Sequence, residues 1–194
     1  MSIWNYMRDA KARLPLIASG SYAALATVVF CTMLAETVFL YPNYFHDIPN
    51  SLVVADEFTA VVSVGSVMRP LGAALTLAAV VAVAVGLWAG QARLWLLASL
   101  LSLVSGLALL SMLYLWPRWT ILFDDRARYT IDELSRTARE IESAHAVRLA
   151  LGALTALLAV IAALRTYRNR ILETAGTGGP RTVACQPTEG GPEK

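Results

Sequence analysis

The stretch of sequence that decides the fold runs from residue 16 to residue 41 and reads LIASGSYAALATVVFCTMLAETVFLY. Glu36 is the only charged residue in it. A helix needs roughly 20 mostly apolar residues to cross the hydrocarbon core of a bilayer, and this stretch exceeds that length. The apolar region of a secretory signal peptide has only about 7–15 residues. The stretch therefore predicts a membrane-spanning helix that is retained as a signal anchor.

Three further apolar segments follow, at residues 67–88, 94–116 and 146–164. Backbone N–H and C=O groups find no water inside lipid, so spanning segments of this kind form helices. The whole chain is 57% hydrophobic and 15% charged, whereas soluble domains carry about 25% charged residues. The sequence predicts an all-α integral membrane protein, a four-helix bundle with up-down-up-down topology, formed by residues 1–172.

The lengths of the loops predict which ends of the spans lie together. Residues 90–93 form a tight turn, whereas residues 42–66 and 117–145 are long loops that four spans would place on one side. Basic residues mark the cytoplasmic side, and the first span usually dominates. Three basic residues precede that span: Arg8, Lys11 and Arg13. The second long loop is also rich in arginine, so the prediction that both termini are cytoplasmic, in the cell membrane, depends on the first span.

The fourth span belongs to a longer predicted helix. Thr130 and Glu133 form a capping box, which predicts that a helix begins directly after Thr130. No proline follows before the fourth span, so we expect one continuous helix to about Leu172, with residues 131–145 extending beyond the membrane. Residues 173–194 are rich in glycine, proline and threonine and are expected to form a disordered cytoplasmic tail.

One face of the fourth span is polar or small and the other is bulky. On a count of about 100° per residue, Glu142, His145 and Arg148 share a face with small side chains. That face continues through Gly152, Thr155 and Ala156, and the opposite face holds Val147, Leu151, Leu154, Leu157, Leu158 and Ile161. Bulky aliphatic side chains suit a lipid-facing surface, and small ones suit a helix contact. We therefore expect Glu142, His145 and Arg148 to point into the bundle.

Glu36 is the second unusual feature, because ionisable groups inside a membrane are costly and often functional. The predicted topology brings it to the same membrane face as His145 and Arg148. A functional site is one interpretation of this coincidence. The other is structural: Glu36 pairs with Arg148 or Arg69 to stabilise the bundle, and His145 is a hydrogen-bonded core histidine.

A metal site is a further hypothesis for the same membrane face. Glu142 and His145 have the Glu-x-x-His spacing that recurs in carboxylate-bridged metal sites of helical bundles. His46 follows the first span, close to Glu36 in the predicted topology. The candidate ligands of a transition metal are therefore Glu36, His46, Glu142 and His145. The chain has only two histidines, which excludes a histidine-rich site.

Short motifs connect this layout to a known family. Tyr41-Pro42 ends the first span, Trp116 and Trp119 follow the third, and His145-x-x-Arg148 enters the fourth. In these features the chain resembles the anthrone-oxygenase-like family of small four-helix membrane proteins. The resemblance implies an oxygenase of aromatic or polyketide-like lipophilic substrates that works without a tightly bound cofactor.

Our leading hypothesis is an oxidoreductase or oxygenase with a pocket between the first and fourth helices, at the extracytoplasmic face. His145 would be a general base or metal ligand, Glu36 its partner carboxylate, and Arg148 the group that holds a developing oxyanion. The alternative is a non-catalytic membrane subunit that docks a partner protein through residues 131–145, and a small transporter is a third interpretation. Expected partners are the bilayer, a lipophilic small molecule, and either a second copy or another membrane protein. A net charge of +2 gives no reason to expect nucleic-acid binding.

Overall fold

The computed structural model describes residues 3–177, and every regular element within that range is helical. The elements are α1 (Ile3–Ala35), η1 (Glu36–Leu40), α2 (Tyr41–Phe45), α3 (Asn50–Phe58), α4 (Val64–Ala89), α5 (Arg93–Ser102), η2 (Leu103–Leu109), η3 (Ser111–Leu115), α6 (Trp116–Phe123), η4 (Arg126–Arg128) and α7 (Ile131–Thr177). Of these, η1, η2 and η3 are π-helical and η4 is a 3₁₀ turn. The all-α prediction is confirmed.

Four helical runs in the described part of the chain are long and apolar enough to cross a membrane, which marks the chain as a membrane protein. They are Arg13–Phe45, Val64–Ala89, Arg93–Phe123 and Ile131–Glu173. Each contains one of the four apolar segments seen in the sequence. Many apolar side chains on their outer faces are exposed, for example Leu113 at 74% and Leu101 at 70%, as expected of surfaces that face lipid.

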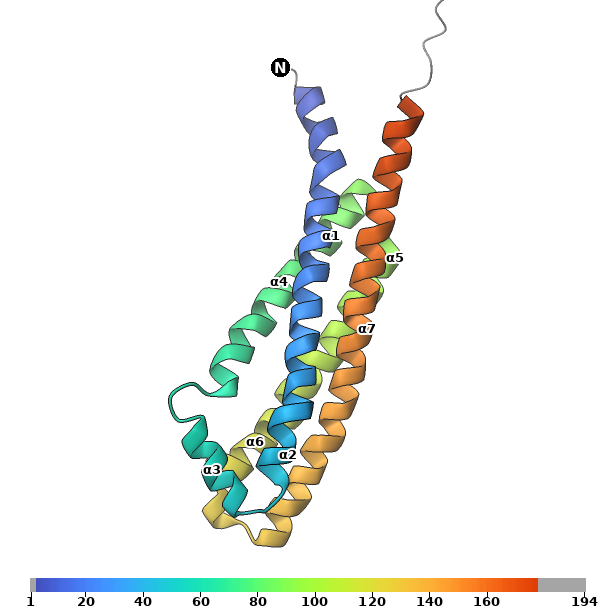
Figure 1. Cartoon of the computed structure of the whole chain (residues 1–194). Coiled ribbons are helices and arrows are strands. Elements are labelled where there is room, and N and C mark those ends of the chain that lie inside the picture. The colour runs from blue at the N-terminus through green and yellow to red at the C-terminus, as the bar shows by residue number, and fades with distance from the viewer. Residues whose placement is uncertain (1–2, 178–194) are drawn as a thin grey trace, which may run out of the picture.

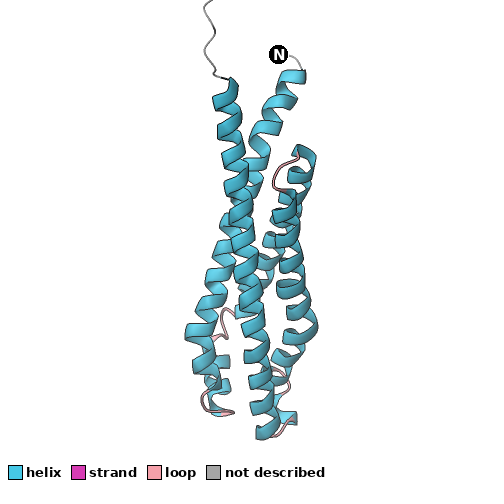
Figure 2. Ribbon diagram, turned by 90° about the vertical axis from the view of Figure 1, so that its right-hand side faces the viewer, coloured by secondary structure: helices cyan, strands magenta, loops and turns pink. Residues whose placement is uncertain are grey.

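The four runs pack as a ring in which each contacts two neighbours. α1 packs against α4 and α7, and α5 packs against the same two helices from the other side. Figures 1 and 2 show the beginning of α1 and the end of α7 at one end of the molecule. The short elements α2, α3 and α6 lie at the opposite end (Figure 1). This second end, which we call the loop end, holds the candidate functional residues.

The interior of the ring combines small residues with polar bridges between helices. The Tyr22 hydroxyl lies 2.7 Å from Ser99 Oγ, and Ser99 in turn donates to the Thr155 carbonyl at 2.8 Å. As the polarity pattern predicted, Gly152, Thr155 and Ala156 are buried, whereas Val147, Leu154 and Leu157 are exposed. The inward face of the fourth span is therefore confirmed for these residues.

Two of the π-helical segments immediately precede an aromatic-proline pair. η1 ends before Tyr41-Pro42, and η3 ends before Trp116-Pro117. Proline lacks a backbone N–H and its ring clashes with the preceding turn, and π-bulges are one way in which a helix absorbs such a disturbance. In η1 the Tyr41 N–H bonds to the Glu36 carbonyl, five residues back, so the two side chains are brought toward the same side of the helix.

α7 begins with the predicted capping box. The Glu133 carboxylate accepts from the Thr130 N–H at 2.8 Å, and the Glu133 N–H donates to Thr130 Oγ1 at 3.3 Å. The helix then continues unbroken to Thr177. The helix therefore ends five residues beyond the predicted end at about Leu172. The rest of the predicted tail lies outside the described residues.

Candidate functional site

An ion pair between the first and last long helices forms the base of the site. Arg148 Nη2 on α7 donates to Glu36 Oε2 on η1 at 2.6 Å. The Glu36 side chain is 7% exposed and that of Arg148 is 16% exposed. Charges this deeply buried persist only when they are paired. Of the two arginines considered as partners of Glu36, Arg148 is the one that binds it.

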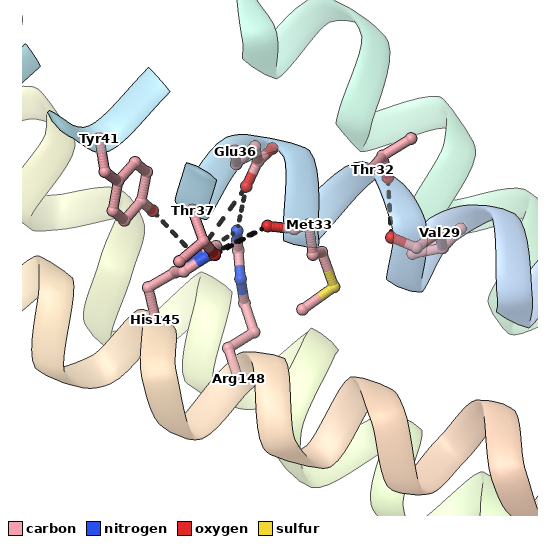
Figure 3. A network of polar contacts seen from close by, with 8 residues as sticks. All are labelled: Val29, Thr32, Met33, Glu36, Thr37, Tyr41, His145 and Arg148. Atoms are coloured by element: carbon pink, nitrogen blue, oxygen red, sulfur yellow. Dashed lines mark hydrogen bonds and ion pairs between the residues drawn. The ribbon is translucent and has the colours of Figure 1, made fainter. Parts of the chain in front are cut away.

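His145 lies behind this pair and is 1% exposed. Its Nδ1 lies 2.9 Å from Arg148 Nη2 and 2.9 Å from the Tyr41 hydroxyl. Figure 3 shows the side chains of this network between the two helices. A guanidinium group can only donate, so Nδ1 must accept, and the ring proton belongs on Nε2. Nε2 lies 2.8 Å from Thr37 Oγ1 and 3.3 Å from the Met33 carbonyl, which supply the acceptors for that proton.

Tyr41 is a member of this network whose place in the site was not predicted from the sequence. It was noted only as part of a Tyr-Pro motif, yet its hydroxyl contacts His145 Nδ1 and its ring centroid lies 4.4 Å from that of the imidazole. On a regular α-helix Tyr41 would point about 140° away from Glu36, at about 100° per residue. The π-helical turn of η1 removes much of that difference. A proline directly after an intramembrane polar residue is the signal that could have indicated it.

The network borders a cavity of about 580 Å³ at the loop end. The lining is mostly aromatic and aliphatic and includes Leu40, Tyr44, Met68, Met112, Trp116, Trp119 and Phe123. Its polar wall is formed in part by Glu36, Tyr41 and Arg148. A volume of this size, with few polar groups in an apolar lining, is typical of a small-molecule site.

His145 does not line this cavity. It borders a smaller space of about 170 Å³ between η1, α2 and α7, together with Thr37, Tyr41 and Glu142. The predicted pocket between the first and fourth helices therefore corresponds to this minor space. The larger cavity lies between η1, α2, the start of α4 and α6, and α7 contributes Arg148 to it. Tyr41 is the residue of the network that borders both spaces and also touches the imidazole.

Three polar groups around the large cavity have no partner that satisfies them. The Tyr44 hydroxyl and Arg148 Nε are buried without a hydrogen bond. Arg69 forms no ion pair with any carboxylate of the described residues, and its guanidinium lies 5.1 Å from the centroid of the Trp116 ring. Buried polar groups are normally satisfied, so the Tyr44 hydroxyl and Arg148 Nε identify positions where a bound molecule could accept or donate. Arg69 is exposed, so its guanidinium is open to a ligand rather than buried without a partner.

The candidate metal ligands do not form a ligand set in this structure. His46 is exposed and its Nδ1 bonds to the Asn43 carbonyl at 3.0 Å. Glu142 is exposed too: it borders the small space beside His145, whereas its bulky neighbour Ile141 is buried in the loop-end core. Among residues 3–177, no three His, Cys, Asp or Glu side chains come together in a way that could hold a metal ion.

The segment considered for docking a partner, residues 131–145, has its apolar face covered within the chain. Leu134, Ala138 and Ile141 are buried in one core with Leu122 of α6. The outer face carries charged side chains, and Arg118 and Arg136 both bond to Glu140. Such a face is typical of a solvated helix.

Comparison of the chain with known protein families, with curated proteins and with solved structures finds no match in any of the three. A function for the chain therefore has to be inferred from its own geometry.

Proposed function

We propose that the chain crosses the cell membrane four times, up-down-up-down, with both termini in the cytoplasm and the loop end outside. The four apolar helical runs supply the spans. The terminal end carries Arg93 at the α4–α5 turn and Arg165, Arg168 and Arg170 near the end of α7, and this clustering of basic residues agrees with a cytoplasmic location. The part of α7 that precedes residue 146 then extends outward from the membrane.

We further propose that the protein is an oxidoreductase of the oxygenase class that acts on a lipophilic substrate in the cavity at the loop end. The observation that carries this proposal is the position of Tyr41, whose hydroxyl touches a buried imidazole while its side chain borders the cavity. A tyrosine connected in this way can pass a proton between a bound molecule and a base that is shielded from water.

The first step is removal of an acidic C–H proton from the substrate. The proton moves to the Tyr41 oxygen as the Tyr41 proton moves to His145 Nδ1. The imidazole becomes positively charged, and the Glu36 carboxylate, 3.9 Å from Nδ1, stabilises it. The substrate becomes an enolate, and Arg148 at the cavity wall stabilises the enolate oxygen. Tyr41 and Arg148 would touch the substrate, whereas His145 and Glu36 would act through them.

Dioxygen is the oxidant and co-reactant of the second step. The carbanion carbon bonds to dioxygen, and the peroxide that forms takes back the proton held by His145. Loss of water then leaves a carbonyl group on the oxidised carbon. For anthrone, the test substrate that the family resemblance suggests, each molecule consumes one molecule of dioxygen and yields anthraquinone and water.

The test is oxygen uptake and anthraquinone formation by the purified protein in nanodiscs supplied with anthrone. The wild type should exceed empty nanodiscs, and His145→Ala and Glu36→Gln should each lower the rate about 100-fold or more, which is typical of losing acid–base assistance. Glu140→Gln, which removes a carboxylate outside the network, should retain the wild-type rate.

Thermal unfolding identifies variants that have lost the fold. If His145→Ala and Glu36→Gln both remain folded and match the wild type, or if the wild type does not exceed empty nanodiscs, the oxygenase proposal is wrong.

A further inference from the structure

The second arginine of the cavity has no role in the proton transfer described above. Arg69 lies in the second turn of α4, among the residues that line the cavity, and is exposed. Its guanidinium packs on the Trp116 ring at 5.1 Å from the ring centroid, a cation–π contact that fixes the direction of the group without neutralising it. Gly65 lies one turn earlier beside the guanidinium, and a Cβ there would make only an ordinary contact with Arg69 Nε, at 3.7 Å.

The acidic residues of the cavity do not neutralise Arg69. Glu36 is engaged by Arg148 at 2.6 Å. Asp124 is exposed, and neither carboxylate comes within 4.0 Å of the Arg69 guanidinium, the limit for an ion pair. Arginine presents several N–H donors in a planar fork that suits carboxylate and phosphate groups. The cavity therefore offers a positive charge with free donors next to an apolar lining.

A second, independent group also lacks a partner here. Tyr44 lines the same cavity, is 6% exposed, and its hydroxyl is buried without a hydrogen bond. An unbonded buried hydroxyl is unfavourable, and an acceptor on a bound molecule would satisfy it. Tyr44 and Trp116 are of the residue types enriched at membrane–water interfaces. The unpartnered groups thus lie where the head of an amphiphile would lie, with its tail among the apolar residues.

We propose that the ligand of this cavity is an anionic amphiphile whose carboxylate or phosphate group binds Arg69. This inference deepens the proposed function, because it describes the substrate class of the same cavity. Either a free lipophilic acid or the head of an anionic lipid could provide that chemistry. The positive charge on Arg69 orients the bound molecule. In this orientation the reacting carbon of the ligand lies at the polar wall, next to Tyr41.

Binding of three amphiphiles with identical tails isolates the contribution of the head. Dodecyl phosphate, dodecanol and dodecyltrimethylammonium are titrated into protein in phosphatidylcholine nanodiscs, with empty nanodiscs as the baseline. The wild type should bind dodecyl phosphate at least about tenfold more tightly than dodecyltrimethylammonium, the preference expected of one charge-assisted contact. In Arg69→Gln that preference should fall to within about twofold.

Arg93→Gln is the matched control, because it removes an exposed arginine from the distant α4–α5 turn, and it should keep the wild-type preference. Arg69→Lys should show a preference between those of Arg69→Gln and the wild type, because lysine restores the positive charge but not the planar fork of donors. A wild type that binds all three compounds equally, or an Arg69→Gln variant that keeps the full preference, would overturn the proposal.

Adding phosphatidylglycerol to the nanodiscs distinguishes the two sources of the anion. If phosphatidylglycerol displaces dodecyl phosphate from the wild type but not from Arg69→Gln, the anion is a lipid head. If it displaces none from the wild type, the anion is a free acid. Equal displacement from the wild type and Arg69→Gln would overturn the site. Oxygen uptake from anthrone, which has no anionic head, tests the oxidation separately. Failure of the oxygenase proposal would leave the binding result standing, and the reverse also holds.

Discussion

The Glu36 carboxylate lies 2.6 Å from the Arg148 guanidinium across the contact between η1 and α7. Removing one partner leaves the other charge buried and uncompensated. Glu36→Gln and Arg148→Gln should therefore each lower the free energy of unfolding by about 3 kcal/mol. The double variant should lose clearly less than the sum, because no unpaired charge remains. Steric-trap unfolding in bicelles measures the free energy of unfolding of the two single variants and the double variant. If the loss in the double variant equals the sum of the two single losses, the two side chains do not interact.

The hydrogen bonds of His145 fix its tautomer. Arg148 Nη2 and the Tyr41 hydroxyl both point at Nδ1, so the ring proton should be on Nε2. Nitrogen NMR of histidine-labelled protein in nanodiscs distinguishes the two ring nitrogens. A His46→Gln variant leaves a single imidazole signal to assign. Finding the proton on Nδ1 would contradict the network, because Arg148 could not then donate there.

Close contact between η2 and α7 depends on Gly106. A Cβ at this position would overlap the Leu151 side chain, so Gly106→Ala must push two spans apart and should lower the free energy of unfolding by about 1–3 kcal/mol. A Cβ at Gly72 on α4 would have no neighbour within 4 Å. Gly72→Ala should therefore be neutral or stabilise by up to about 1 kcal/mol. Equal losses in the two variants would mean that the contact is not as tight as described.

The proposed orientation predicts which turns can be labelled from outside the cell. In a background with Cys31→Ser and Cys185→Ser, a membrane-impermeant maleimide should label Tyr129→Cys in intact cells. It should label Gln91→Cys, in the turn between α4 and α5, only after permeabilisation. The reverse pattern would invert the topology and move the cavity to the cytoplasmic face.

The helices themselves could be predicted from the sequence because each depends on a local rule. Apolar length indicated the spans, and the capping box at Thr130 marked the start of α7. The period of small and bulky residues identified the inward face of the fourth span, including His145. One candidate partner of Glu36, Arg148, was correct because Arg148 was expected to face the bundle and the predicted topology brought both residues to the same membrane face.

The remainder of the site depends on tertiary structure that the sequence does not encode locally. Tyr41 reaches His145 only because η1 is wound as a π-helix, and periodicity arguments assume a regular α-helix. Glu142 was expected beside His145, one turn away, and it borders the same small space but is exposed, because the neighbouring Ile141 takes the buried position in the loop-end core. The cavity gathers residues from several separate elements, so no single segment could indicate it.

The contact between Tyr41 and His145 is the centre of the proposed chemistry, and one comparison of two variants tests it. Tyr41→Phe and Tyr22→Phe each remove one buried tyrosine hydroxyl with one side-chain partner, but Tyr22 bonds to Ser99, away from the cavity. The rate of oxygen uptake with anthrone should fall about 100-fold or more in Tyr41→Phe and stay near the wild-type rate in Tyr22→Phe. Equal rates in the two folded variants would contradict the account.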